Sequence, residues 1–185
     1  MKKIFALLFA VVGLVGLQSC EGPEGPPGYD GESVVAQVFD LPATNFYAAA
    51  GGNLSEKVVP RQWKQFDGDV ILVYMRDGFD NNNNPIWRLM PQTYYVNIVG
   101  VTEEIDYNYD FTFNDVKIFA EATRDLASFP RNFTQDQYFR IVVIPGFNPI
   151  KINYATDAAK SKDYETIRAQ YNLDQVAVQN ITWGK

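Results

Sequence analysis

The stretch "DGFDNNNNP", from Asp77 to Pro85, gathers side-chain oxygen atoms of the kind that bind hard cations. Carboxylate and amide oxygens are the ligands that calcium prefers, so Asp77, Asp80 and Asn82 are candidate calcium ligands. The stretch lacks the alternate-position spacing and the terminal glutamate of a recognised calcium loop. Asp, Asn and Gly also tolerate the backbone dihedrals of tight turns, so a hairpin connection is the favoured interpretation and a calcium site is the alternative.

A second acidic group, Glu103, Glu104 and Asp106, stands directly before an aromatic run and is predicted to be a solvated turn. Two carboxylates can hydrolyse a glycoside only when a cleft holds them about 5 to 10 Å apart, a separation that the sequence does not give, so a hydrolase stays a distant third hypothesis. The chain has no histidine, which excludes Ser-His-Asp and Cys-His catalysis and histidine-rich metal sites. We therefore predict a protein that is not an enzyme and holds no cofactor.

Aromatic residues are the feature on which a binding hypothesis can be built, since the chain has 13 Phe, 11 Tyr and 3 Trp. The candidates for a platform on which sugar rings stack are Trp63, Trp87, Tyr94 and Tyr95, together with Trp183. Aromatic and β-branched residues are also what strands prefer and what sandwich cores contain. Core packing is therefore the favoured interpretation of these side chains, and a glycan-binding surface is the alternative.

The elements that must position these side chains follow a two-residue hydrophobic period, which is typical of β-strands. The clearest case is the run in which Tyr107, Tyr109, Phe111 and Phe113 alternate with polar residues. Further strands are predicted at 34–41, 69–75, 94–101, 116–122, 139–144 and 176–183. Short strands closed by turn residues predict an all-β fold, a mainly antiparallel β-sandwich of about seven to nine strands over residues 34–185.

One segment near the C-terminus has a helical period instead. Tyr164, Ile167 and Tyr171 share one face of the expected helix, and Thr156 or Asp157 can cap its N-terminus. Because asparagine tolerates the left-handed conformation that often ends a helix, Asn172 offers a stop signal. The sequence predicts a single short helix of about three turns in this place.

The N-terminus has the layout of an export signal, because two lysines precede an apolar or glycine run from Ile4 to Leu17. The run is shorter than the roughly 20 residues that span a bilayer, so cleavage is expected. The sequence Leu17-Gln18-Ser19-Cys20 resembles the lipobox of bacterial lipoproteins, in which the cysteine is acylated and becomes the mature N-terminus. This resemblance implies a signal peptide at residues 1–19 and acyl chains such as palmitate on Cys20, the only cysteine.

Four Gly-initiated triplets follow the cysteine, from Gly22 to Ser33. They meet the glycine period of collagen, but four triplets bury too little apolar surface to hold three chains together. An extended, polyproline-like tether at residues 20–33 is the favoured interpretation, and its stretch from Gly22 to Glu32 would span roughly 35 Å. Removal of the signal leaves fourteen basic against twenty-two acidic residues. An acidic chain without a basic cluster argues against nucleic acid binding and against electrostatic attachment to anionic lipid.

Four segments carry a further resemblance: "DVILVY" at 69–74, "WRLMPQTYY" at 87–95, "DVKIFAEATRDL" at 115–126 and "QYFRIVVIPG" at 137–146. They are similar to a group of short lipoproteins of the Bacteroidota that also carry collagen-like triplets after the lipid-bearing cysteine. The resemblance implies lipid attachment to the outer membrane, on its periplasmic or its surface face, and supplies no catalytic residue. We therefore expect a non-enzymatic structural or accessory lipoprotein that docks a protein partner of the cell envelope. The alternative is a cell-surface module that binds a glycan or calcium.

Overall fold

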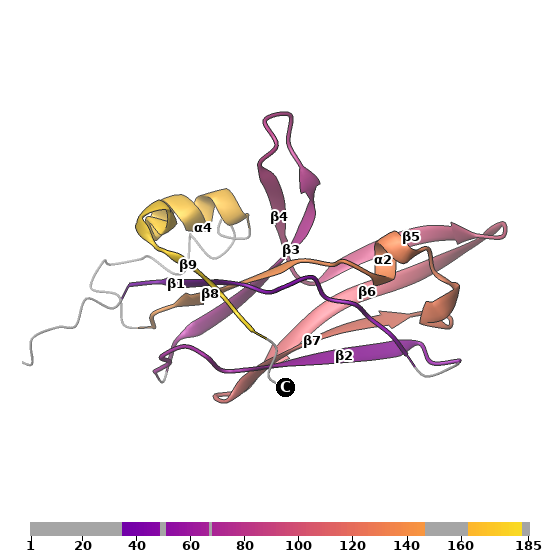
Figure 1. Cartoon of the computed structure of the whole chain (residues 1–185), viewed down its shortest axis with the longest axis horizontal. Coiled ribbons are helices and arrows are strands. Elements are labelled where there is room, and N and C mark those ends of the chain that lie inside the picture. Colours follow the sequence, from indigo (N-terminus) through magenta and orange to yellow (C-terminus); the bar gives the residue numbers. More distant parts are fainter. Residues whose placement is uncertain (1–34, 49–50, 67, 147–162, 183–185) are drawn as a thin grey trace, which may run out of the picture. The chain divides into compact units, whose positions relative to one another are not determined.

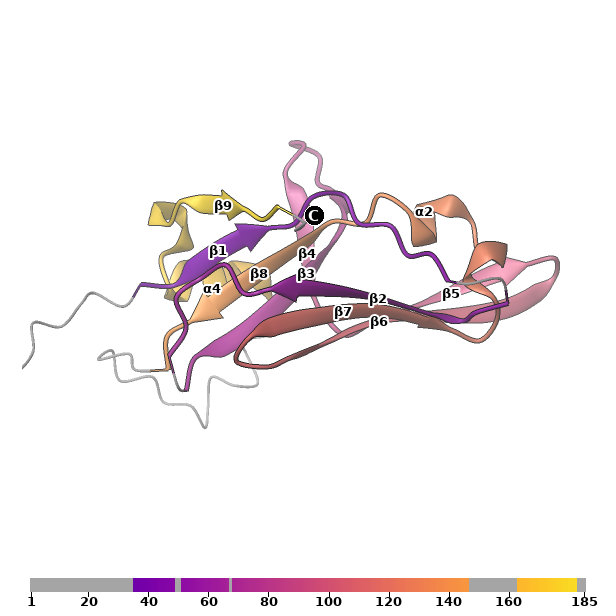
Figure 2. The same cartoon turned by 60° about the horizontal axis from the view of Figure 1, so that its bottom comes forward.

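Two β-sheets pack face to face and enclose the main core (Figures 1 and 2). The computed structural model describes residues 35–48, 51–66, 68–146 and 163–182. The larger sheet has five strands in the order β4 (Pro85–Leu89), β3 (Val70–Phe79), β8 (Phe139–Ile144), β1 (Gln37–Asp40) and β9 (Val178–Asn180). The smaller sheet has four strands in the order β2 (Leu54–Pro60), β7 (Asp115–Ala122), β6 (Val101–Phe111) and β5 (Gln92–Ile98).

The prediction of a β-sandwich with about seven to nine strands is confirmed, because the described residues form nine strands in these two sheets. Neighbouring strands are antiparallel, with one exception: β1 and β9 run parallel. The predicted signal peptide, the acylated Cys20 and the tether lie outside the described residues.

The sandwich core forms because the strands place apolar side chains on alternate positions, as their period requires. In β7, Val116, Ile118 and Ala120 point into the core and are fully buried. The facing strands of the larger sheet contribute Val73 and Ile141, which are also fully buried. Burial of each Val or Ile side chain in this layer contributes about 1.5 to 3 kcal/mol to the stability of the fold.

A second apolar cluster lies on the other side of the five-stranded sheet, under α4 (Tyr164–Gln170) and the short helix η2 (Leu173–Gln175). Ile167 and Leu173 are buried there against Tyr74 and Val142. The five-stranded sheet is therefore covered on both faces. This double burial explains why β8 reads "FRIVVI", an almost continuous apolar run instead of an alternating one.

The predicted C-terminal helix is confirmed, but it is shorter than expected. Asp163 caps α4, because its side chain accepts a hydrogen bond from the backbone N–H of Glu165. The predicted caps, Thr156 and Asp157, lie outside the described residues. Asn172 has a φ of 51° and ends the segment in the left-handed conformation, as predicted.

Two short helices that the sequence did not predict, η1 (Leu126–Ser128) and α2 (Arg131–Thr134), connect β7 to β8. No helix in the described part of the chain is long and apolar enough to cross a lipid bilayer.

The predicted strand at 94–101 is confirmed only as far as Ile98, and the predicted acidic turn at 103–106 is wrong. A tight turn at Val99 and Gly100, with φ values of 51° and 82°, ends β5 at Ile98. Both turn residues have positive φ, as in the two-residue turns that join antiparallel strands, so β6 begins directly at Val101. The acidic group therefore lies inside β6 and not in a solvated loop.

The predicted last strand is also shorter than expected. It was predicted over residues 176–183, whereas β9 spans only Val178–Asn180. Trp183 lies outside the described residues.

Candidate functional site

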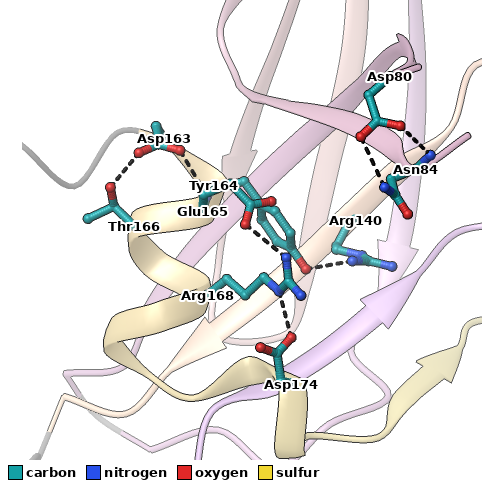
Figure 3. A network of polar contacts seen from close by, with 9 residues as sticks. All are labelled: Asp80, Asn84, Arg140, Asp163, Tyr164, Glu165, Thr166, Arg168 and Asp174. Atoms are coloured by element: carbon teal, nitrogen blue, oxygen red, sulfur yellow. Dashed lines mark hydrogen bonds and ion pairs between the residues drawn. The ribbon is translucent and has the colours of Figure 1, made fainter. Parts of the chain in front are cut away.

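The candidate calcium ligand Asp80 closes the turn between β3 and β4 (Figure 3). Its Oδ1 accepts hydrogen bonds from the backbone N–H groups of Asn82, at 2.8 Å, and Asn84, at 2.7 Å. Its Oδ2 accepts a hydrogen bond from the side-chain amide of Asn84 at 3.0 Å, and these contacts hold the pKa of Asp80 below its ordinary value. The favoured interpretation, a hairpin connection, is confirmed by the pairing of β3 with β4.

The second candidate ligand, Asp77, binds different groups. Its Oδ2 lies 2.5 Å from Nε of Arg88 across the hairpin, and its Oδ1 accepts a hydrogen bond from the hydroxyl of Tyr94 at 3.0 Å. Over the described ranges, no group of three or more Asp, Glu, His or Cys side chains is placed to hold a metal ion. Asp77 therefore links the hairpin to the smaller sheet.

The aromatic candidates do not share one surface. Trp63 is 7% exposed and packs in the core against Phe39, with ring centroids 5.3 Å apart. Tyr94 points inward, and burial raises the pKa of its hydroxyl to about 12. Tyr95, the next residue of the same strand, points the opposite way and is 70% exposed. Trp87 is half-buried on the outer side of the five-stranded sheet.

The outer face of the four-stranded sheet is a broader candidate. We call it the open face, because in Figures 1 and 2 no other labelled element covers it. The side chains that the strand register directs outward include five carboxylates, one lysine and four apolar groups: Glu56, Glu104, Asp106, Asp110, Glu121, Lys117, Leu54, Val58, Tyr95 and Phe119. The alternate residues of the same strands, such as Ile105 and Ile118, are fully buried in the core.

The one lysine of the open face is already paired. Nζ of Lys117 lies 3.2 Å from Oδ2 of Asp110 and 3.3 Å from Oε1 of Glu56. The hydrogen bonds with Asp110 and then with Glu56 hold the pKa of Lys117 above its ordinary value. Two of the five carboxylates therefore have a cationic partner, and three do not.

These three carboxylates, Glu104, Asp106 and Glu121, lie together on the two central strands. Asp106 stands directly opposite Glu121 in the register of β6 and β7, and Glu104 follows on the same side of β6. Asp106 accepts a hydrogen bond from the hydroxyl of Thr93, whereas Glu104 and Glu121 have no side-chain partner within the described residues. Like charges directly opposite in a sheet are destabilising, so folding alone does not explain this arrangement.

Apolar side chains adjoin the acidic group. Glu104 is paired across the sheet with Tyr95, and Glu121 is paired with Leu54, which is 44% exposed. Val58 is 51% exposed on the same edge strand. The open face therefore combines an unneutralised negative charge with apolar surface that a partner can bury.

The sequence contained part of this information. Glu104 and Asp106 were recognised as an acidic group, but placing them in a turn hid the fact that they alternate with buried Ile105 and Tyr107. Glu121 was missed, because only the pairing of two strands brings it opposite Asp106. Comparison with protein-family models, with curated proteins and with solved structures gave no match to this chain.

Proposed function

We propose that this protein is a non-enzymatic lipoprotein, anchored to the outer membrane through acylated Cys20, that docks a basic protein partner on its open face. The observation that carries the proposal is the unneutralised pair of Asp106 and Glu121, with Glu104 beside it. In the isolated domain these charges repel each other. A lysine or arginine of a partner would turn that repulsion into attraction.

The apolar residues of the open face support the same proposal. Tyr95 is exposed for 70% of its surface and stands next to the acidic group, where a partner can cover its ring. Aromatic side chains supply much of the affinity of protein interfaces, whereas complementary charge supplies orientation and fast association. An acidic centre with an exposed aromatic ring on the neighbouring edge strand therefore fits a basic partner that presents apolar side chains beside its cations.

The alternative glycan platform has less support on this side of the molecule. A row of exposed tryptophans would favour it, but Trp63 is buried and Trp87 is half-buried on the other sheet. Among the candidate stacking residues that the structure describes, Tyr95 alone is exposed. Docking to a protein accounts for both the charge and the apolar surface of the open face.

The docking proposal is tested with the full chain in detergent, using affinity capture from solubilised envelope membranes at low and high salt. We expect a captured protein with a basic surface to be lost at high salt and lost on Glu121→Lys, because both changes remove the electrostatic attraction. Glu165→Lys is the matched control, since it changes the net charge by the same amount but lies on α4, which packs on the five-stranded sheet. Equal capture by both variants would contradict the proposal.

The anchor is tested separately with Cys20→Ala. The variant should leave the membrane fraction and should lose label from a palmitate analogue, because two or three acyl chains are needed for stable attachment. Unchanged labelling in this variant would show that the lipid is attached elsewhere.

A further inference from the structure

A groove lies on the outer side of the five-stranded sheet, away from the open face. It has a volume of about 740 Å³ and runs between the hairpin of β3 and β4 and the segment formed by α4, η2 and β9. Figure 3 shows Asp80 and Asn84 on the hairpin side and Tyr164 and Arg168 on the helix side, with Arg140 between them. Volumes of this order are typical of sites for small ligands. We call it the outer groove.

The outer groove has two aromatic side chains held in fixed positions. Trp87 and Tyr164 lie with ring centroids 6.4 Å apart. The guanidinium of Arg140 stands 4.5 Å over the Trp87 ring and donates a hydrogen bond to the Tyr164 hydroxyl at 2.5 Å. Arg140 is itself held by two hydrogen bonds to the carboxylate of Asp40, at 2.6 and 2.8 Å. The rings are therefore organised before any ligand arrives, which lowers the entropic cost of binding.

Every charged side chain that lines the outer groove already has a partner. Arg168 bridges Glu165, at 2.8 Å, and Asp174, at 2.6 Å. Asp163 caps α4 and Asp80 closes the hairpin turn. An anionic or cationic ligand would have to displace one of these contacts. A neutral ligand rich in hydroxyl groups would not, because each carboxylate oxygen can accept a further hydrogen bond.

Trp87 has a feature that packing alone does not require. Its indole N–H is buried and has no hydrogen-bond partner within the described residues. A buried donor without a partner costs about 1 to 3 kcal/mol, and a phenylalanine would fill the same site without this cost. A tryptophan at this position therefore costs stability compared with phenylalanine, and its larger ring is of the kind that stacks against a ligand.

We propose that the outer groove binds a neutral oligosaccharide. The part of the Trp87 ring that stays exposed would contact the apolar face of a sugar, and Tyr164, which is only 9% exposed, would hold Arg140 in place. The pairs that Arg168 makes with Glu165 and Asp174 would share hydrogen bonds with the hydroxyl groups of the sugar. Exposed Ile86 and Val178 extend the apolar surface at the rim. This site lies on the opposite sheet from the open face. The test of saccharide binding is therefore independent of the test of the proposed docking function.

The test is calorimetric titration of the full chain in detergent with three neutral trisaccharides: maltotriose, cellotriose and tri-N-acetylchitotriose. We expect at least one of them to bind with a Kd of about 10 to 1000 µM. Trp87→Ala should weaken binding about tenfold or more, whereas Tyr47→Ala, at an exposed tyrosine outside the lining of the groove, should leave it unchanged. Glucosamine trisaccharide and trigalacturonate are the charged controls, and they should bind more weakly.

A second variant guards against a folding defect in Trp87→Ala. Arg168 is paired only at the surface, with its side chain 42% exposed, so Arg168→Gln should keep the thermal midpoint while it reduces saccharide affinity several-fold. The proposal is overturned if none of the three neutral trisaccharides binds, if a charged control binds more tightly, or if Arg168→Gln and Trp87→Ala both bind as the parent does.

Discussion

The outer faces of the two sheets differ in burial and in charge pairing. The five-stranded sheet is covered by α4 and η2, and its Arg140 is bonded to Asp40 and Tyr164. The four-stranded sheet exposes its outer face and sets Asp106 opposite Glu121 without a cation between them. The covered face stabilises the domain through burial. The unpaired like charges of the open face lower the stability of the domain slightly, and such a loss is common at functional surfaces.

The difference between the two faces is tested most strongly by removing an apolar side chain from each face in turn. Ile167 is 3% exposed under α4, so Ile167→Ala should lower the free energy of unfolding by about 3 kcal/mol. Val58 is 51% exposed on the open face, so Val58→Ala should change it by about 0.5 kcal/mol or less. Urea unfolding of both variants measures the difference. Equal losses would mean that the open face is covered after all.

A second prediction concerns the ion pair of the covered face. The side chains of Arg140 and Asp40 are 13% and 28% exposed, so their bond is partly shielded from water. Arg140→Ala would leave Asp40 without its cation and should cost about 2 kcal/mol, less than for a fully buried pair. Arg140→Lys should cost less than the alanine change, because it keeps the charge but loses the two-pronged geometry. Thermal unfolding checks this order, and a smaller loss for alanine would contradict it.

In the smaller sheet, the sequence predicted a strand only where its apolar residues alternate toward the core. Burial of one face imposes a two-residue period, and β7, "DVKIFAEA", has that period clearly. In β2, "LSEKVVP", Leu54 and Val58 point outward and Lys57 points inward, so the pattern is reversed at those positions. That strand was therefore missed, because its outward apolar residues belong to the open face and not to the core.

Both candidate sites depend on contacts that are distant in the sequence. Asp40 and Arg140 are 100 residues apart and meet only because β1 pairs with β8. Asp106 and Glu121 meet only through the register of β6 and β7. Residue types and local spacing contain no information on such pairing, so the sequence could identify the acidic residues and Trp87 as candidates but not their neighbours.

A third prediction is a small gain in stability when one charge of the open face is removed. Glu121→Gln removes one of two like charges that face each other, so it should raise the free energy of unfolding by about 0.5 kcal/mol. The same change should weaken capture of a basic partner. A matched Glu165→Gln variant on α4 loses a favourable contact with Arg168 and should not gain stability. A stabilised control, or a destabilised Glu121→Gln, would contradict the view that the open face is strained by its charges.

The smallest predicted effect is a loss of stability at acid pH, caused by protonation of Asp163 at the start of α4. Hydrogen bonds, chiefly from the Thr166 hydroxyl, hold the pKa of Asp163 below its ordinary value of 3.8. The stabilisation is fully present above pH 3.8 and is lost as the pH falls through the lower pKa of the folded state. Asp163→Asn can still cap α4 but does not titrate, so the variant should lose less stability than the parent between about pH 6 and about pH 3. Urea midpoints at both pH values measure it, and an identical loss would contradict the role of this cap.

The place of β1 in its sheet has a mechanical consequence. β1 lies between β8 and β9, and its register joins Gln37–Asp40 to β8 and Val38–Asp40 to β9. A pull that reaches the domain through the chain before β1, directed along the strand, would load both ladders in shear. All their hydrogen bonds would then have to break together, and resistance to such forced unfolding depends on the height of that barrier. The position of β1 therefore predicts that the domain resists unfolding by a force applied through this strand.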